Sequence, residues 1–166
     1  YDVYSFGSGG FAETVFDTSI TSTSLTFSNG IVKINDRACS GCSGLAGTLT
    51  LPNTLTEIGQ VAFYQCSGLT GTLTIPASVT TLNRGCFKDC TGFTALVLNN
   101  GLTRLNNSSG GDPYGCFTGC TGFTGTLTLP STLTYIANST FRGCTGFTSV
   151  VFNSVPTIQS VSSDRN

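Results

Sequence analysis

The sequence predicts a repeat solenoid of about five coils of 23–24 residues, with a parallel β-sheet on one face and short turns, 3₁₀ turns or helical turns on the others. Three observations predict this fold class. A short apolar-x-apolar segment returns at a nearly constant step, a Phe column and a Cys column keep the same phase, and each Cys precedes Ser or Thr and then Gly. One such coil cannot bury its own inner face, whereas stacked coils share a continuous core.

The apolar-x-apolar segment opens each unit and is expected to be a short strand. Side chains alternate along a strand, so the two apolar residues of the segment share one face. Proline after the segment cannot donate to a sheet and ends the strand. Strands are therefore predicted at residues 49–51, 73–75, 96–98 and 127–129, with weaker copies at 25–27 and 150–152.

Two further segments complete each unit. An apolar pair three residues apart, such as Leu55 and Ile58, indicates a second short extended or turn segment. Phe63 and Cys66 then have the i, i+3 spacing of one helical turn, and the Gly that follows lets the backbone turn back. Successive units begin 24, 24, 23, 31 and 23 residues apart, so the long step indicates an insertion near residues 106–115.

The two ends of the chain depart from the repeat pattern. We expect residues 1–24 to form an N-terminal cap or half coil that covers the first repeat. Residues 25–153 are expected to form the repeats, and residues 154–166 a polar C-terminal tail.

The complete unit has the pattern L-T-[IL]-P-x-[ST]-[LV]-T-x-[IL]-x-x-x-[AC]-F-x-x-C-[ST]-G-[LF]. Over about residues 25–152 it resembles the BspA-type leucine-rich repeat. The resemblance implies a right-handed, curved leucine-rich repeat solenoid in a secreted or cell-surface protein of a bacterium or a microbial eukaryote. It implies no particular ligand, because arrays of this kind serve adhesion, recognition and scaffolding alike.

The composition excludes several classes of function. Only 9% of the residues are charged and the net charge is −1, which excludes a nucleic-acid binder that is steered by charge. The chain has no His, so Ser-His and Cys-His nucleophile pairs and His-metal sites are excluded. The acidic residues are scattered, so we expect no enzyme and no cofactor. No apolar run approaches the ~20 residues that span a bilayer.

Other features point to an extracellular setting. Eight Cys, few Lys and a Thr and Ser content above one quarter are typical of secreted chains. Three N-x-[ST] sequons, at Asn106, Asn107 and Asn138, are candidate glycosylation sites.

The Cys column is predicted to be buried as free thiols. Neighbouring coils lie ~4.8 Å apart, whereas a disulfide requires Cβ atoms ~3.5–4.5 Å apart. The column consists of Cys42, Cys66, Cys90, Cys120 and Cys144. Cys86 and Cys116 lie outside it as disulfide candidates: they can pair with each other, or with Cys90 and Cys120 respectively. Cys39 and Cys42 form a C-x-x-C pair, but no second ligand pair accompanies it, so no metal site is predicted.

Thr rows line the outer face of the predicted strands, with Thr48 and Thr50 in one coil and Thr72 and Thr74 in the next. They resemble the ice-binding face of some insect β-solenoid antifreeze proteins. Val97 interrupts the rows, which favours the simpler interpretation that Thr is a good strand former. O-glycosylation is a third interpretation.

Two functions fit these observations. The first is a non-enzymatic extracellular structural protein whose copies join head to tail into a fibre or surface layer, because a weakly capped solenoid exposes an unfilled coil and such a contact does not close. In this hypothesis the partner is a second copy of the chain. The residues expected at the contact are Phe11, Val15, Phe16, Val150, Phe152, Val155 and Ile158.

The alternative is a leucine-rich-repeat adhesion or ligand-binding module at the cell surface. Its partner would be a glycan or a host or cell-surface protein. One column varies from coil to coil and is the place where a specific contact is expected. Its members are Lys33, Glu57, Thr81, Arg104 and Tyr135.

Overall fold

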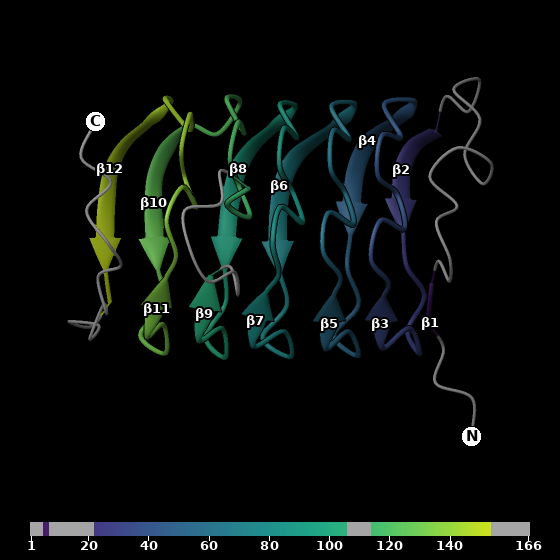
Figure 1. Ribbon diagram of the computed structural model, residues 1–166, viewed down its shortest axis with the longest axis horizontal. Helices are drawn as coiled ribbons and strands as arrows, with labels where there is room; N and C mark the ends of the chain where they lie inside the picture. The colour runs from purple at the N-terminus through teal and green to yellow at the C-terminus, as the bar shows by residue number, and fades with distance from the viewer. Residues whose placement is uncertain (1–4, 7–21, 106–113, 154–166) are drawn as a thin grey trace.

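The protein is a parallel β-solenoid, which confirms the predicted fold class. The computed structural model describes residues 5–6, 22–105 and 114–153. Its coils stack side by side along one axis, and each coil contributes a long strand, a short strand and a turn segment (Figure 1).

The long strands form one row along the solenoid. They are β2 (Ser22–Thr26), β4 (Leu45–Thr50), β6 (Leu69–Ile75), β8 (Phe93–Leu98), β10 (Gly125–Leu129) and β12 (Phe147–Phe152). All pairs are parallel, and most follow the repeat columns, as in Leu73 opposite Leu96 and Leu127 opposite Val150. The pair of β4 and β6 is offset from the columns, with Thr48 opposite Thr70. The row is hydrogen-bonded as a four-stranded sheet, β2-β4-β6-β8, and a two-stranded sheet, β10-β12.

All six long strands begin earlier than predicted. β6 starts at Leu69, the residue that closes the preceding unit, and its pairing with β8 shifts by one residue at Gly71. Gly71 has a φ of 77°, a left-handed conformation that Gly adopts without a steric penalty. The bulge therefore lets one strand include both the closing residue of one unit and the opening segment of the next.

The short strands form the second row. They are β1 (Ser5–Phe6), β3 (Lys33–Ile34), β5 (Glu57–Ile58), β7 (Thr81–Leu82), β9 (Arg104–Leu105) and β11 (Tyr135–Ile136). They make a six-stranded parallel sheet in the order β1-β3-β5-β7-β9-β11. Every segment that an apolar pair three residues apart predicted to be extended is therefore a strand. β1 has no sequence signal and was not predicted.

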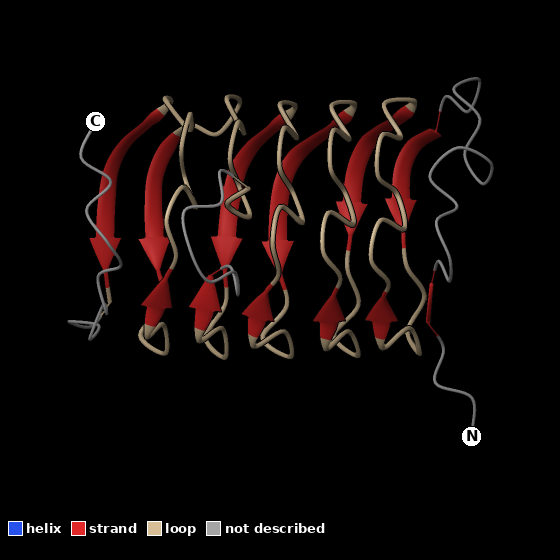
Figure 2. Ribbon diagram, viewed as in Figure 1, coloured by secondary structure: helices blue, strands red, loops and turns tan. Residues whose placement is uncertain are grey.

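The third side of each coil is built from turns, and no described residue is helical (Figure 2). The Cys66 amide donates to the Phe63 carbonyl at 3.2 Å, which closes the turn that the i, i+3 spacing indicates. Amides of this side also donate to the following coil: Phe63 N to Cys86 O at 2.8 Å and Phe87 N to Cys116 O at 2.9 Å. Backbone bonds thus connect neighbouring coils on all three sides.

The core is a stack of aromatic rings between the strand rows and the turns. Phe87 lies parallel to Phe63, with ring centroids 5.2 Å apart, and parallel to Phe117, with centroids 5.9 Å apart. The edge of Phe93 meets Phe87 at 6.4 Å. All four of these rings are fully buried. Offset stacked and edge-to-face rings each add about 0.5–1.5 kcal/mol beyond the area that they bury.

Threonine hydroxyls add a further set of bonds between coils. Thr103 Oγ1 donates to the carbonyl of Thr80 at 2.9 Å, and Thr134 Oγ1 donates to the carbonyl of Thr103 at 3.0 Å. Thr56 Oγ1 makes the same bond to Val32 O at 3.1 Å. Much of the Thr content therefore serves to connect coils.

The two strand rows are offset by one strand. At the N-terminal end, the short-strand row has one extra strand, β1, which lies beyond β3 and has no described long strand beside it (Figure 1). At the C-terminal end, the long-strand row has one extra strand, β12, and the short-strand row stops at β11 within the described residues. The described array therefore begins with the short half of a coil and ends with the long half.

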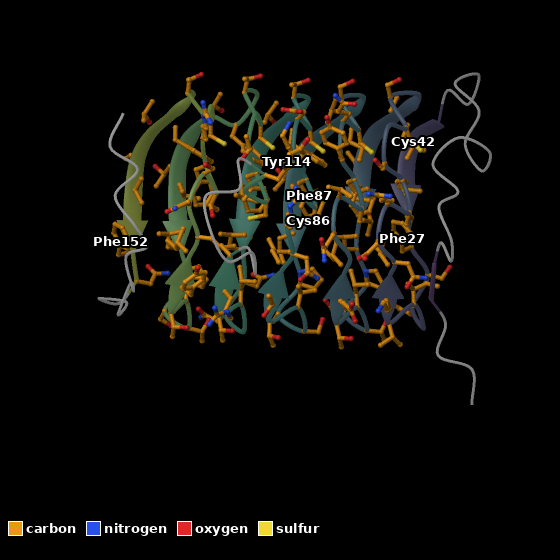
Figure 3. All side chains as sticks on the ribbon, in the orientation of Figure 1. Phe27, Cys42, Cys86, Phe87, Tyr114 and Phe152 are labelled. Carbon is orange, nitrogen blue, oxygen red and sulfur yellow. The ribbon has the colours of Figure 1, made fainter. Side chains whose placement is uncertain are left out.

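Within the described residues, the C-terminal end of the array is open. Val150 and Phe152 are 50% and 51% exposed, although the equivalent residues of the preceding coil, Leu127 and Leu129, are only 4% and 3% exposed. Figure 3 shows Phe152 at this end of the array. At the N-terminal end, by contrast, Ile34 is fully buried next to β1.

Candidate binding face

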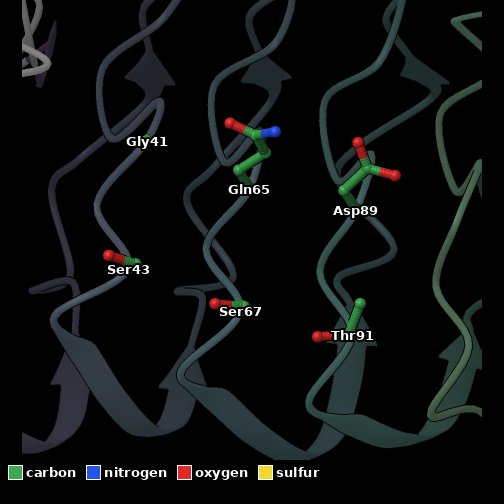
Figure 4. Close-up of a pocket in the computed structure, with 6 residues that line it drawn as sticks. All are labelled: Gly41, Ser43, Gln65, Ser67, Asp89 and Thr91. Atoms are coloured by element: carbon green, nitrogen blue, oxygen red, sulfur yellow. The ribbon is translucent and has the colours of Figure 1, made fainter.

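A shallow polar groove crosses three coils on the turn side of the solenoid. Its volume is about 430 Å³. Figure 4 shows Gln65 and Asp89 in adjacent coils on one side of the groove and a row of hydroxyl-bearing residues on the other. The lining residues are Gly41, Ser43, Gln65, Ser67, Asp89 and Thr91. All of them are small or polar, so the groove offers hydrogen bonds and no apolar pocket.

The column that holds Gln65 and Asp89 has a left-handed backbone. These two residues have φ values of 59° and 60°, and the equivalent residues Gly41, Gly119 and Gly143 have φ values of 78°, 77° and 81°. A side chain in this conformation costs roughly 1–2 kcal/mol. Three coils avoid that cost with Gly, whereas two of the three coils that line the groove carry an amide and a carboxylate.

A cluster of aromatic and cationic side chains lies beside the groove. The Lys88 ammonium is 4.9 Å from the ring centroid of Tyr64 and 5.1 Å from that of Tyr114, and it also donates to Asp89 Oδ2. The Arg84 guanidinium stacks 4.3 Å from the centroid of Tyr114. Contacts of this type contribute about 0.5–2 kcal/mol each. They hold the Lys88 ammonium, which offsets the charge of Asp89.

The Cys column makes one repeated hydrogen bond. Four thiols of the column donate to the carbonyl of the Phe-column position in the preceding coil, as in Cys90 Sγ to Phe63 O at 2.9 Å and Cys120 Sγ to Phe87 O at 3.0 Å; the other two are Cys66 and Cys144. Cys42, Cys66, Cys90 and Cys120 are buried, and Cys144 in the open last coil is half-buried. A Cys at this position is small enough for the core and donates to a carbonyl that the turn leaves with a free lone pair.

Burial makes these thiols poor nucleophiles. It raises the pKa of Cys39 to about 12 and that of Cys144 to about 11, and it raises the pKa of Cys66 and Cys90 further. The thiolate is the reactive form of Cys, so little of it is present near neutral pH. Among the described residues, no group of three or more His, Cys, Asp or Glu is placed to hold a metal ion.

Cys86 and Cys116 lie in adjacent coils and are both fully buried. Their thiols are hydrogen-bonded to each other, and burial raises the pKa of Cys116. Both are free thiols in the structure, and the Cys86–Cys116 bridge stays a prediction.

The variable column on the short-strand row is internally paired. Lys33 Nζ lies 2.9 Å from Glu57 Oε1, and this ion pair raises the pKa of Lys33, chiefly through the hydrogen bond to Glu57. The Arg104 guanidinium stacks 4.2 Å from the ring centroid of Tyr135. These side chains therefore already use each other as partners, which makes this column a weaker candidate than the groove.

Several predicted site residues lie outside the part of the chain that the structure describes. Among the sequons, only Asn138 is described: it is half-buried, next to Thr140, whose buried hydroxyl donates to Ala137 O at 2.7 Å. Of the predicted self-assembly residues, Val150 and Phe152 are described and lie at the open end. The residues outside are Phe11, Val15, Phe16, Asn106, Asn107, Val155 and Ile158.

Sequence reasoning missed the groove and the aromatic-cationic cluster. Tyr64 and Lys88 each follow the Phe of their unit, so they share a repeat column. Aligning the units would therefore have predicted that these two residues are neighbours. Tyr114 lies within the range predicted for the insertion and so outside the repeat phase. Its place beside Lys88 has no such signal.

The protein is a leucine-rich repeat solenoid. This class is defined by its two strand rows, its turn side and its repeated Leu, Phe and Cys columns. The chain belongs to the family of BspA type leucine rich repeat regions, whose model matches residues 11–109 and 113–164 in six copies. This match confirms the resemblance carried by the repeat unit.

Two solved structures share the fold. One is a leucine rich cell surface protein from Faecalibacterium prausnitzii, with a TM-score of 0.72 and 22% identity, and the match covers 86% of this chain and 35% of that one. The other is a leucine-rich repeat protein from Eubacterium ventriosum, with a TM-score of 0.66 and 20% identity, and the match covers 86% of this chain and 36% of that one. The chain thus spans about a third of the length of either protein.

No curated protein sequence matches the chain. Among the described residues, no helix is long and apolar enough to cross a membrane.

Proposed function

We propose that the protein is a non-enzymatic structural protein of the cell surface whose copies stack head to tail. The observation that carries this proposal is the offset between the two strand rows. Family membership and the likeness to a cell surface protein of Faecalibacterium prausnitzii support the surface location.

The two ends of the described array are complementary halves of one coil. If a second copy docks on the open end, its β1 lies next to β11 and its β2 lies next to β12. Both rows then continue as parallel sheets across the junction, with Leu25 of the second copy opposite Val150. The contact is heterologous, so each added copy presents the same open end again and the assembly grows as a fibre.

Apolar burial drives the contact. Val150 and Phe152 occupy the core-facing columns but are about half exposed. Full burial of such side chains is worth about 1.5–3 kcal/mol each, so completing their burial contributes about 1 kcal/mol each. The low charge of the chain leaves little repulsion between copies. The N-terminal residues Phe11, Val15 and Phe16 are proposed to add to the same contact.

Sedimentation of purified protein over a range of concentrations tests the proposal. We expect the mass to rise with concentration for the natural chain and to stay near 17.2 kDa for Phe152→Lys. Val97→Lys is the matched control, because Val97 is 41% exposed but lies in the middle of the array. A chain that remains monomeric at high concentration, or an assembly that Phe152→Lys does not disturb, would refute head-to-tail stacking.

We further propose that this surface protein is a glycoprotein if it passes through a eukaryotic secretory route. Asn106 and Asn107 are adjacent in a polar segment, so one sugar at this pair is expected. An intact mass equal to that of the bare chain would exclude the modification.

A binding role at the cell surface is the second candidate function. The observation that favours it is the polar groove, where Gln65 and Asp89 occupy left-handed positions that other coils fill with Gly. Backbone strain of this kind is often retained where a side chain has a function.

A further inference from the structure

We propose that the groove on the turn side binds an extended, uncharged glycan chain, with one sugar unit per coil across three coils. This inference rests on the binding role just proposed and is independent of head-to-tail stacking. Coils of a solenoid repeat every ~4.8 Å, which is comparable to the length of one pyranose unit in an extended chain.

The groups that line the groove suit the hydroxyl groups of a sugar. The Gln65 amide both donates and accepts hydrogen bonds, and the Asp89 carboxylate accepts from two donors. Ser43, Ser67 and Thr91 add one hydroxyl per coil on the opposite side. Within the described residues, these three hydroxyls take no part in the coil-to-coil bonds that other Thr side chains make. The groove therefore offers unused polar groups at a regular spacing.

The charges favour a neutral ligand. Among the described residues, Asp89 carries the only charged group that lines the groove, and Lys88 already neutralises this carboxylate from one side. An acidic sugar would meet this carboxylate and gain no cation in the groove. Uncharged glycans avoid that repulsion and still use Asp89 as an acceptor.

The backbone of the groove argues against an extended peptide as the ligand. Peptides that lie along a protein surface bind by adding a strand to an unpaired sheet edge or by filling side-chain pockets. Here the amides of Gly41, Gln65 and Asp89 already donate to Tyr64, Lys88 and Thr118 of the next coil, at 2.7, 2.9 and 2.8 Å. With no apolar residue in the lining, a peptide finds neither a backbone edge nor a pocket.

The left-handed column provides variants that separate binding from folding. Gln65→Gly and Asp89→Gly insert the residue that Gly41, Gly119 and Gly143 carry at the same place. Both variants should fold and melt at the natural temperature or above it, because Gly removes the steric strain. Thr121→Ala is the matched control, because Thr121 belongs to the same hydroxyl row but lies outside the groove.

An array of immobilised neutral and acidic oligosaccharides, followed by calorimetry with the neutral chains that bind, tests the inference. We expect a linear neutral trisaccharide to bind at least tenfold more tightly than the disaccharide, and a hexasaccharide to gain little more per site. Gln65→Gly and Asp89→Gly should each weaken binding at least tenfold, and Thr121→Ala should leave it unchanged.

Several outcomes would overturn the inference. Binding to no neutral glycan, a preference for acidic glycans or for neutral peptides, or Gly variants that bind as tightly as the natural chain would each do so. The experiment is repeated on Phe152→Lys, which should be monomeric and should bind as the natural chain does. A failure of head-to-tail stacking and a failure of glycan binding are therefore told apart by sedimentation and calorimetry.

Discussion

Replacement of Phe87 by Ala should be among the most destabilising single changes in the chain. Phe87 is fully buried, stacks on Phe63 and Phe117, and meets the edge of Phe93. Truncation of a buried Phe costs about 3–5 kcal/mol, and the lost ring pairs place the expected value near the upper end of that range. Equilibrium unfolding in urea, followed by circular dichroism, measures the change.

The matched comparison is Phe141→Ala, in the same column. Phe141 is half-buried in the open last coil and stacks on a single column neighbour, Phe117, at 5.6 Å. Its truncation should therefore cost less than half as much. If Phe87→Ala and Phe141→Ala destabilise the protein equally, the explanation based on stacking and on an open C-terminal end is wrong.

Two further predictions concern the backbone and the thiols. Val61 has a φ of 48°, and the residue in the same column of the next unit is Gly85. Val61→Asn should raise the free energy of unfolding by about 1 kcal/mol, because Asn tolerates this conformation and a β-branched residue does not. A lower melting temperature of the variant would contradict this. Burial raises the pKa of Cys39 to about 12, whereas a thiol in the unfolded chain ionises near 9. Above pH 9 the unfolded chain therefore holds fewer protons than the folded one, and stability should fall with rising pH by about 1.4 kcal/mol per pH unit for Cys39 and for each other thiol whose pKa burial raises as far. Urea unfolding under reducing conditions at pH 8, 9.5 and 11 measures this, and a flat profile would rule it out.

The core of the solenoid is predictable from the sequence because its residues must face one shared interior. Leu73, Phe87 and Cys90 each repeat at a fixed place in the unit, and their columns give the stacking order of the coils directly. The extent of the strands is less predictable. β6 begins at Leu69 because a bulge at Gly71 lets the strand pass from one unit into the next, and a bulge leaves no periodic signal.

The candidate binding face is much less predictable, because it depends on backbone conformation and on a contact outside the repeat. Gln65 and Asp89 share a left-handed backbone with Gly41, and the signal for it in the sequence is the Gly that three other units carry in this column. Tyr114 lies within the range predicted for the insertion, so no periodicity places it beside Lys88. The thiol-to-carbonyl bonds are likewise hidden in a Cys column that sequence reasoning treats only as small and apolar.

The coil-to-coil bonds have a mechanical consequence. Each coil bonds mainly to its two neighbours, so a chain pulled from both ends gives way one coil at a time, starting where a coil has a neighbour on one side only. A coil occupies about 4.8 Å of the axis, whereas its 23–24 residues reach about 80 Å when drawn out. Under tension the protein should lengthen in steps, as an extensible tether. Bridging Cys86 to Cys116 would shorten this reach, because the 29 residues between them would stay in a closed loop.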